Sequence, residues 1–313
     1  MKIRTTSLSL FLLFWAPAFA QKWPTQIIPR DRLGVYQVKA EEGAFLYETA
    51  SYRIQSPKKI DSDLVRNFVI SAESVAFALK SIPLPLFSPP HRIKPLIRIE
   101  LDEESYAAAG GPKGSAGFYD GRSNIVVVRW DQLKQSPRPS RLIRRPAFDL
   151  LVHELTHLGM REQIWKIEPW LTEGVAEYLA AAHLKQGRFN FRDIEAQIRD
   201  HIRRQNGLSG PSINATTLQV LVDLSYRDWL KRIAILPPKQ ALESYTSSLL
   251  LTHFYFHGGS ERRHEMKQYL TRLQKITSPR ERGPLLVSST EASEIEKKIK
   301  AYWSSRGLQL HFR

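Results

Sequence analysis

The stretch Phe148-Asp149-Leu150-Leu151-Val152-His153-Glu154-Leu155-Thr156-His157-Leu158-Gly159 fixes both a helix and the chemistry that this helix carries. Pro146 can open the helix, and Gly159 can end it. Its apolar positions recur at helical spacing and predict one buried face: Phe148, Leu151, Val152 and Leu155. His153 and His157 are four residues apart, so their side chains project from one face about one turn from each other.

Two imidazoles in this arrangement can both bind one zinc ion at about 2.0–2.1 Å. The intervening Glu154 can reach a metal-bound water and take its proton as a general base. The chain contains 0 Cys, so any metal must be bound by histidines and carboxylates. Cysteine proteases and cysteine-ligated zinc sites are therefore excluded.

A third ligand is offered by the segment Trp170-Leu171-Thr172-Glu173-Gly174-Val175-Ala176-Glu177-Tyr178, in which fifteen residues, 158–172, separate Glu173 from His157. Its pattern predicts a second amphipathic helix. Glu173 and Glu177 are four residues apart and share a face. One of them can bind the metal while the other accepts a hydrogen bond from a ligand imidazole.

These two segments together resemble the gluzincin metallopeptidases, in which HExxH is followed by a helix with a glutamate ligand in a W-L-x-E-G-x-A-E-Y block. The resemblance implies one Zn²⁺ ion bound by His153, His157 and Glu173, with Glu154 as catalytic base and Glu177 in support. The spacer is shorter than in zinc aminopeptidases of that group, and their G-x-M-E-N motif is absent. The sequence is thus more similar to peptidase-like proteins of bacterial envelopes, and the substrate does not carry over.

Two further features follow from the resemblance. Ser244-Tyr245-Thr246-Ser247-Ser248 is similar to the S-Y-x-K-G stretch that supplies a transition-state tyrosine, which implies that Tyr245 donates its hydroxyl to the oxyanion. The alternative is a tyrosine that only packs in the core. Gluzincins also pair the bound peptide with an edge strand, for which residues 124–129 are the candidate; an interior strand is the alternative.

The fold class expected is α+β, with a zincin-like arrangement. Residues 21–145 should hold a mixed sheet with helices, since apolar runs near 35–38, 45–47, 52–54, 96–101 and 125–128 read as strands and 62–79 as a helix. A basic linker, 134–145, leads to the second part. Residues 146–313 should form a helical lobe in one catalytic unit with the first, with helices near 147–158, 171–185, 191–205, 217–231, 239–257, 261–275 and 290–305.

The N-terminus and the charge bear on location and partners. Residues 1–20 begin with Lys2 and Arg4, continue through an apolar run and end on small residues, as in a secretory signal peptide. We therefore expect a secreted or periplasmic protein with no transmembrane segment after cleavage. The net charge is +15, and losing Lys2 and Arg4 leaves +13. This charge favours anionic partners such as envelope polymers, membrane surfaces or acidic substrates, and it also suits non-specific nucleic-acid binding; a merely solvated basic face is the alternative. With the metal motif, we expect a peptide or protein substrate, an anionic envelope polymer as a further partner, and no specific nucleic acid.

The remaining histidines and serines give weaker signals. His253 and His257 repeat the four-residue spacing, but without a suitable acid a packing or substrate-facing role is preferred to a second metal. Surface positions are expected for four others: His183, His201, His264 and His311. No Gly-x-Ser-x-Gly elbow occurs, which disfavours a serine hydrolase. The rival to a peptidase is a catalytically weak or inactive zinc-containing module that binds peptides or anionic envelope polymers through its basic surface. A third possibility is a basic polymer-binding protein in which HExxH is accidental.

Overall fold

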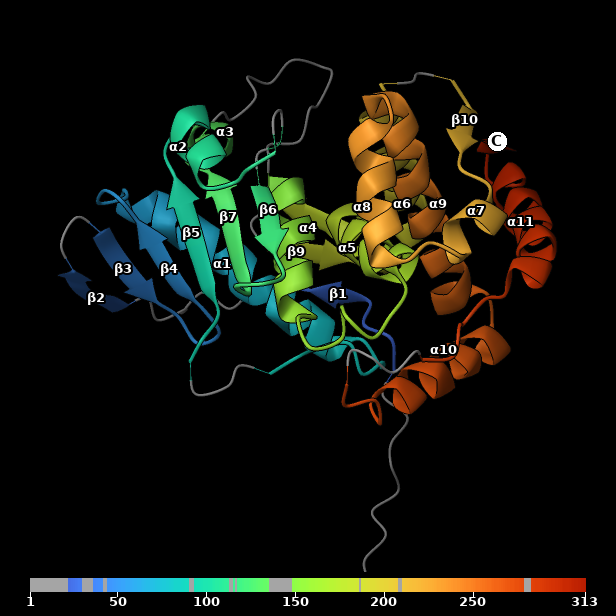
Figure 1. The fold of residues 1–313 in the computed structure, drawn as a ribbon, viewed down its shortest axis with the longest axis horizontal. Coiled ribbons are helices and arrows are strands. Elements are labelled where there is room, and N and C mark those ends of the chain that lie inside the picture. Colours follow the sequence, from blue (N-terminus) through green and yellow to red (C-terminus); the bar gives the residue numbers. More distant parts are fainter. Residues whose placement is uncertain are drawn as a thin grey trace, which may run out of the picture.

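The computed structural model describes residues 22–29, 36–41, 44–89, 93–112, 115, 117–134, 148–185, 187–207, 210–278 and 283–313. The expected signal peptide, Pro146 and nearly all of the basic linker lie outside these residues. The described part combines a mixed sheet with many helices, which confirms the α+β class (Figure 1). Within it, no helix combines the length and apolarity needed to cross a membrane.

The main sheet has six strands in the order β2-β3-β4-β5-β7-β6. Their bounds are β2 Tyr36–Glu41, β3 Ala44–Glu48, β4 Arg53–Ser56, β5 Leu96–Glu100, β6 Gly117–Asp120 and β7 Ile125–Arg129. Strands β4, β5 and β7 run parallel, while β6 is antiparallel to β7 and forms the edge. The prediction that 124–129 is an edge strand was wrong, because the 117–120 segment folds back on β7 and covers it.

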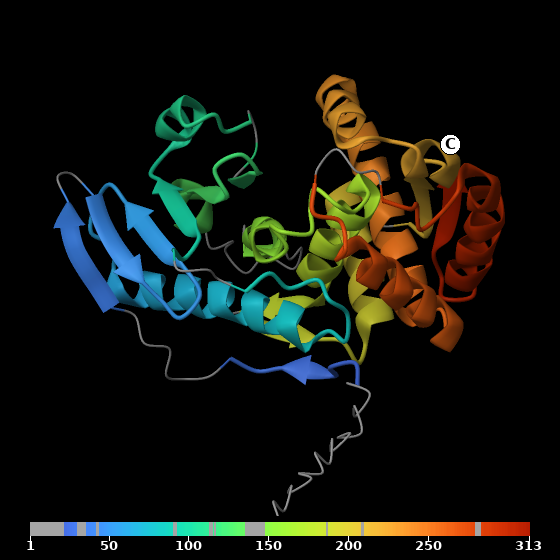
Figure 2. The same cartoon turned by 60° about the horizontal axis from the view of Figure 1, so that its bottom comes forward.

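Helix α1 (Ser62–Ser81) links the sheet to the metal-binding motif. The carboxylate of Asp61 caps it by accepting the N–H of Asp63 at 3.0 Å. Its buried stripe contains Phe68, Ala72, Val75 and Leu79. Helix α4 (Phe148–Gly159) packs on α1, and a Cβ at Gly159 would lie 2.4 Å from Leu79 Cδ1. Figure 2 shows α1 running along the sheet toward α4.

The second half of the chain is mainly helical and surrounds α5 (Pro169–Ala182), whose residues are all buried. The other helices are α6 Ile194–Asn206, α7 Leu218–Val222, α8 Tyr226–Ile235, α9 Pro238–His257, α10 Ser260–Leu273 and α11 Ser289–Ser304. Two short helices, α2 (Glu103–Ala108) and α3 (Trp130–Lys134), belong to the sheet half. One continuous hydrophobic core joins both halves.

Two sequence-based boundaries were wrong. The helix expected over 217–231 is divided into α7 and α8, because the Ser225 hydroxyl accepts the N–H of Asp228 at 3.2 Å and starts a new helix. The helix expected over 171–185 ends at Ala182, because β8 (His183–Lys185) pairs with β9 (Arg188–Asn190), which also pairs with β1 (Gln26–Ile27). A further parallel pair, β10 (Ser212–Ala215) with β11 (Gln309–Phe312), was not predicted.

Candidate metal centre

Helix α4 brings the two motif histidines together. Leu151, Val152 and Leu155 anchor its opposite face in the core. The Nε2 atoms of His153 and His157 consequently face each other at 3.1 Å, and both rings are buried.

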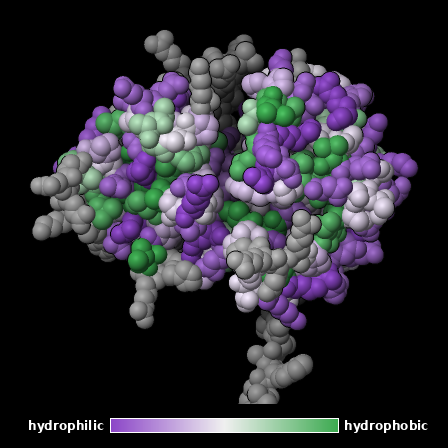
Figure 3. All heavy atoms as spheres, in the orientation of Figure 1, coloured by the Kyte–Doolittle hydropathy of each residue, from purple (hydrophilic) through white to green (hydrophobic). Residues whose placement is uncertain are grey.

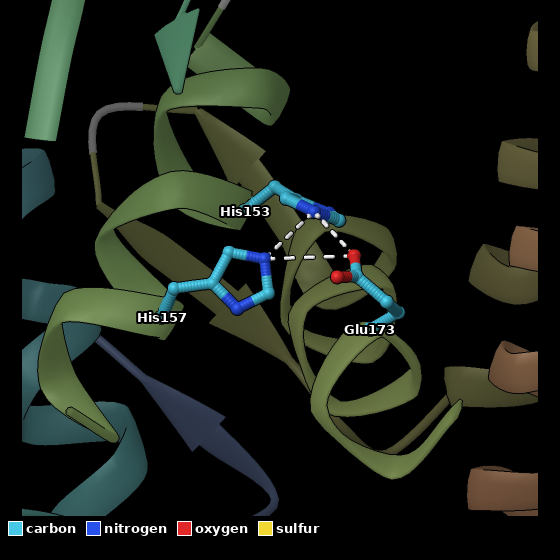
Figure 4. A group of neighbouring side chains, drawn as sticks. All are labelled: His153, His157 and Glu173. Atoms are coloured by element: carbon cyan, nitrogen blue, oxygen red, sulfur yellow. Dashed lines mark hydrogen bonds and ion pairs between the residues drawn. The ribbon is translucent and has the colours of Figure 1, made fainter. Parts of the chain in front are cut away.

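Glu173 completes a triangle of donor atoms with these histidines (Figure 4). Its Oε2 lies 3.3 Å from His153 Nε2 and 3.6 Å from His157 Nε2. The ligand atoms of a tetrahedral zinc ion, each about 2.0–2.1 Å from the metal, are about 3.3–3.4 Å apart. The three residues therefore form a buried group that could hold a metal ion, as predicted. No second group of this kind occurs in the described ranges.

Close packing of α5 against α9 sets the position of Glu173. A Cβ at the adjacent Gly174 would lie 2.0 Å from Thr252 Oγ1 and 2.3 Å from the carbonyl oxygen of Ser248. Only glycine permits this approach, since any side chain would collide with the α9 backbone. In the W-L-x-E-G block, the candidate ligand Glu173 is therefore followed directly by Gly174, the residue whose close contact with α9 positions the helix.

Glu177 orients one ligand imidazole. Its Oε1 lies 3.1 Å from His153 Nδ1, which leaves Nε2 of that ring directed toward the triangle. Its Oε2 accepts hydrogen bonds from Nε2 of His201 at 2.6 Å and of Gln205 at 2.8 Å. His157 is held differently, by stacking against Tyr119 with ring centroids 6.0 Å apart.

The charges of the site are coupled. Burial alone would lower the pKa of His153, but hydrogen bonds to Glu173 and Glu177 raise it well above its usual value. Burial alone would raise the pKa of Glu173, but His157 and His153 lower it to about 2. The metal-free site is therefore an imidazolium paired with carboxylates. A cation held by this triangle would displace the proton on His153, so metal binding would release protons.

Glu154 lies beside the triangle and against strand β6. A Cβ at Gly117 would be 3.3 Å from Glu154 Cγ, so the glycine lets the strand approach the carboxylate. The backbone N–H of Tyr119 donates a hydrogen bond to Glu154. Burial raises the pKa of Glu154, although His153 and His157 oppose this shift. A carboxylate with a raised pKa is suited to accept and return a proton.

Tyr245 approaches the same centre from α9. Its ring lies 6.1 Å from that of His153 and packs edge-on against Trp229 at 5.5 Å. Burial and the carboxylates of Glu173 and Glu154 raise the pKa of Tyr245 well above its ordinary value. The phenol therefore keeps its proton at neutral pH and can donate a hydrogen bond into the site.

The triangle, Glu154 and Tyr245 line one cleft of about 1220 Å³ between the sheet half and the helical half. Figure 3 shows this hollow, bordered by both hydrophilic and hydrophobic residues. The sheet side is formed by β6, and the helical side includes α8 and Tyr245. The cleft is larger than the 300–1,000 Å³ that is usual for small-molecule pockets.

The sequence reasoning missed two groups at this centre. His201 was expected at the surface but is only 4% exposed, because it lies on the buried stripe of α6 with Ile194, Ile198 and Ile202. That spacing was the available signal. Tyr226, at the start of α8, lines the cleft, and its pKa is raised by burial and by Glu173 and Glu154. No local motif marks it.

The other histidines divide between packing and surface. The surface prediction was also wrong for His183, which is buried and lies 3.3 Å from Asp149. His264 and His311 are exposed, as expected. His253 packs against Trp303, and His257 Nε2 lies 2.8 Å from the Tyr178 hydroxyl, in agreement with a packing role for this pair.

No protein-family model matches this chain, and no curated protein matches it. Its function must therefore be inferred from the chemistry of the site.

Proposed function

We propose that the protein is an exported zinc-dependent metallopeptidase with a zincin-like, gluzincin-type arrangement. The observation that carries this proposal is the buried triangle of His153, His157 and Glu173 beside a carboxylate, Glu154, that is not part of it. Structural zinc sites usually provide four protein ligands. Three donors beside a free carboxylate in a large cleft instead favour a catalytic site with one coordination position open to water or substrate.

The residues suit hydrolysis of an amide bond. Zinc bound here would supply Lewis acidity, which lowers the pKa of a water ligand and polarises a carbonyl group. Glu154 accepts a proton from the attacking water at its carboxylate and then delivers it to the departing amine nitrogen. Tyr245 donates its hydroxyl to the carbonyl oxygen as that oxygen becomes negative. Glu177 holds the His153 ring so that only its Nε2 faces the cation.

The edge strand supports a polypeptide as the substrate. Among the strands that the structure describes, β6 pairs with β7 alone, and its residues line the cleft next to Glu154. An extended peptide can add to such an edge by backbone hydrogen bonds. The role that the resemblance assigned to 124–129 therefore passes to Gly117–Asp120.

The test compares wild type with Glu154→Gln, each loaded with zinc, on a peptide library, with bound metal quantified in both. We expect one zinc per chain in each protein and a loss of about 10²–10⁴-fold in cleavage rate for Glu154→Gln. Glu294→Gln, an exposed carboxylate on α11, serves as the matched control and should cleave normally. Measurable turnover by zinc-loaded Glu154→Gln at the wild-type rate would remove Glu154 from the reaction.

Chelation and metal analysis separate the alternatives. If the wild type binds zinc but cleaves no peptide, the non-hydrolytic peptide- or polymer-binding module is the better description. If it binds no zinc, the metal site itself is wrong. Loss of zinc in His157→Ala would link the bound metal to this triangle.

A further inference from the structure

Exposed apolar side chains gather at the cleft. The structure describes ten large hydrophobic residues that are strongly exposed, and four of them line this cleft: Trp165, Tyr226, Leu230 and Leu285. Single exposed hydrophobics are ordinary, but a cluster of them in one groove marks a binding surface. The cluster has two parts, one on α8 and one where two loops meet.

The first part is one face of helix α8. Tyr226, Leu230 and Ile233 all line the cleft, and their spacing of four and three residues puts them on one side of the helix. Trp229 is the only buried residue of α8, and it is anchored edge-on against Tyr245. Through this contact, the helix presents its apolar face directly beside the tyrosine that approaches the metal centre.

The second part joins the loop after α4 to the loop before α11. Ile164, Trp165 and Leu285 line the cleft there. The buried carboxylate of Glu168 accepts the N–H of Leu286 at 2.7 Å and the hydroxyl of Tyr269. A buried carboxylate thus fixes the segment that carries Leu285, and Leu285 is held in place although its side chain is 56% exposed.

We propose that these two apolar surfaces select polypeptide substrates with bulky apolar side chains, such as Leu or Phe, close to the bond that is cleaved. The inference rests on the proposed peptidase function and specifies its substrate class. The α8 surface comprises Tyr226, Leu230 and Ile233, and the loop surface comprises Ile164, Trp165 and Leu285. An extended chain paired with β6 directs alternate side chains to opposite sides and presents them to the cleft walls.

The test uses zinc-loaded protein and a positional-scanning peptide library, in which each position carries Leu or Phe in one set and Gly, Asp or Lys in the others. We expect kcat/KM for wild type to be about tenfold or more higher when one position near the scissile bond is apolar. Leu230→Ser or Leu285→Ser should reduce kcat/KM for the matching apolar peptide by about tenfold. Cleavage of the glycine peptide should fall by less, so the ratio of kcat/KM for the apolar peptide to that for the glycine peptide should drop in both variants.

Ile235→Ser is the matched control. Ile235 is on the same helix and is 81% exposed, but it does not line the cleft, so its replacement should leave the preference unchanged. Because Leu230 and Leu285 are each more than half exposed, their replacement by serine should leave the Tm close to that of wild type. Equal cleavage of apolar and polar peptides, or an unchanged preference in both serine variants, would overturn the proposal.

A binding assay separates failure of this inference from failure of the peptidase function. Zinc-loaded Glu154→Gln is mixed with fluorescently labelled peptides that carry Leu or Asp at the varied position, and anisotropy is measured. One outcome is that wild type cleaves no peptide, that the Leu peptide binds more tightly than the Asp peptide, and that adding Leu230→Ser weakens binding of the Leu peptide. In that case the surfaces select ligands and only hydrolysis is refuted. If neither cleavage nor selective binding is found, the surfaces do not select substrates.

Discussion

His201 lies 2.6 Å from Glu177, and this contact extends the metal centre beyond the residues of its two motifs. Glu177 contacts His153 Nδ1 through its other oxygen, so a histidine on α6 supports the orientation of a ligand on α4. Outer partners of this kind fix the ring orientation and basicity of metal ligands, and their loss typically costs 10–100-fold in metal affinity. We predict such a loss for His201→Phe, which keeps an aromatic ring but removes the hydrogen-bond donor.

Competition with a chromogenic chelator measures this effect. His264→Phe, which replaces an exposed histidine, is the control and should bind zinc normally. The metal-free Tm of both variants is compared as well, because a purely structural defect would lower Tm without a matching change in zinc affinity. An affinity of His201→Phe within about twofold of wild type would show that Glu177 needs no support from α6.

Tyr245→Phe should slow turnover without weakening the metal site. The replacement keeps the ring between His153 and Trp229 and removes only the hydroxyl. Loss of one oxyanion donor typically lowers kcat by about 10²–10³-fold. Steady-state kinetics and zinc quantification together test this. Tyr255→Phe, on the same helix but outside the cleft, should be nearly silent, and equal rates for the two variants would reduce Tyr245 to a packing residue.

Gly174→Ala should destabilise the protein and weaken zinc binding together. In an exposed helix this change stabilises by about 0.8–1 kcal/mol. Here the new methyl group would collide with the backbone carbonyl of Ser248, which cannot move as a side chain does. We expect a net loss of about 1–3 kcal/mol in the free energy of unfolding, measured with urea.

The change also displaces the helix that carries Glu173, so zinc affinity should fall. Gly210→Ala is the control, because a Cβ at Gly210 meets nothing within 4 Å and this glycine does not have a positive φ. A Gly174→Ala protein as stable as Gly210→Ala would mean that α5 and α9 separate without cost.

Local spacing explains what the sequence could predict. His153 and His157 meet because four residues make about one helical turn, and the Glu173–Glu177 pair follows the same rule. A glutamate on the next helix could then be expected as the third donor. The α+β division was also readable, since strand and helix periods differ along the chain.

The features that the sequence could not predict depend on contacts between residues far apart in the chain. The edge of the sheet is β6 rather than β7, because the pairing of Phe118 with Val127 depends on a turn and not on the strand pattern. His201 lies 24 residues from Glu177, and no spacing rule connects residues on separate helices. Tyr226 lines the cleft from the start of α8. This helix begins there because the Ser225 cap divides the expected helix into α7 and α8.

Glu168 should make the free energy of unfolding depend on pH, and Glu168→Gln should remove this dependence. Burial raises the pKa of this carboxyl above the ordinary 4.5, against the opposing hydrogen bonds from Tyr269 and Leu286. A carboxyl with a raised pKa in the folded state favours folding when it is protonated. Its contribution is complete below pH 4.5 and is lost as the pH rises through the raised pKa.

Gln mimics the protonated carboxyl, because its oxygen can accept from Leu286 while its amide faces Tyr269. We therefore expect the free energy of unfolding of Glu168→Gln, relative to wild type, to increase as the pH rises above 4.5. Urea unfolding of both metal-free proteins at matched pH values measures this difference, in which contributions of the metal centre cancel. Glu294→Gln, an exposed change, should show no such trend. If the difference in free energy of unfolding between Glu168→Gln and wild type is the same at every pH, the pKa of Glu168 is the same in the folded and unfolded states.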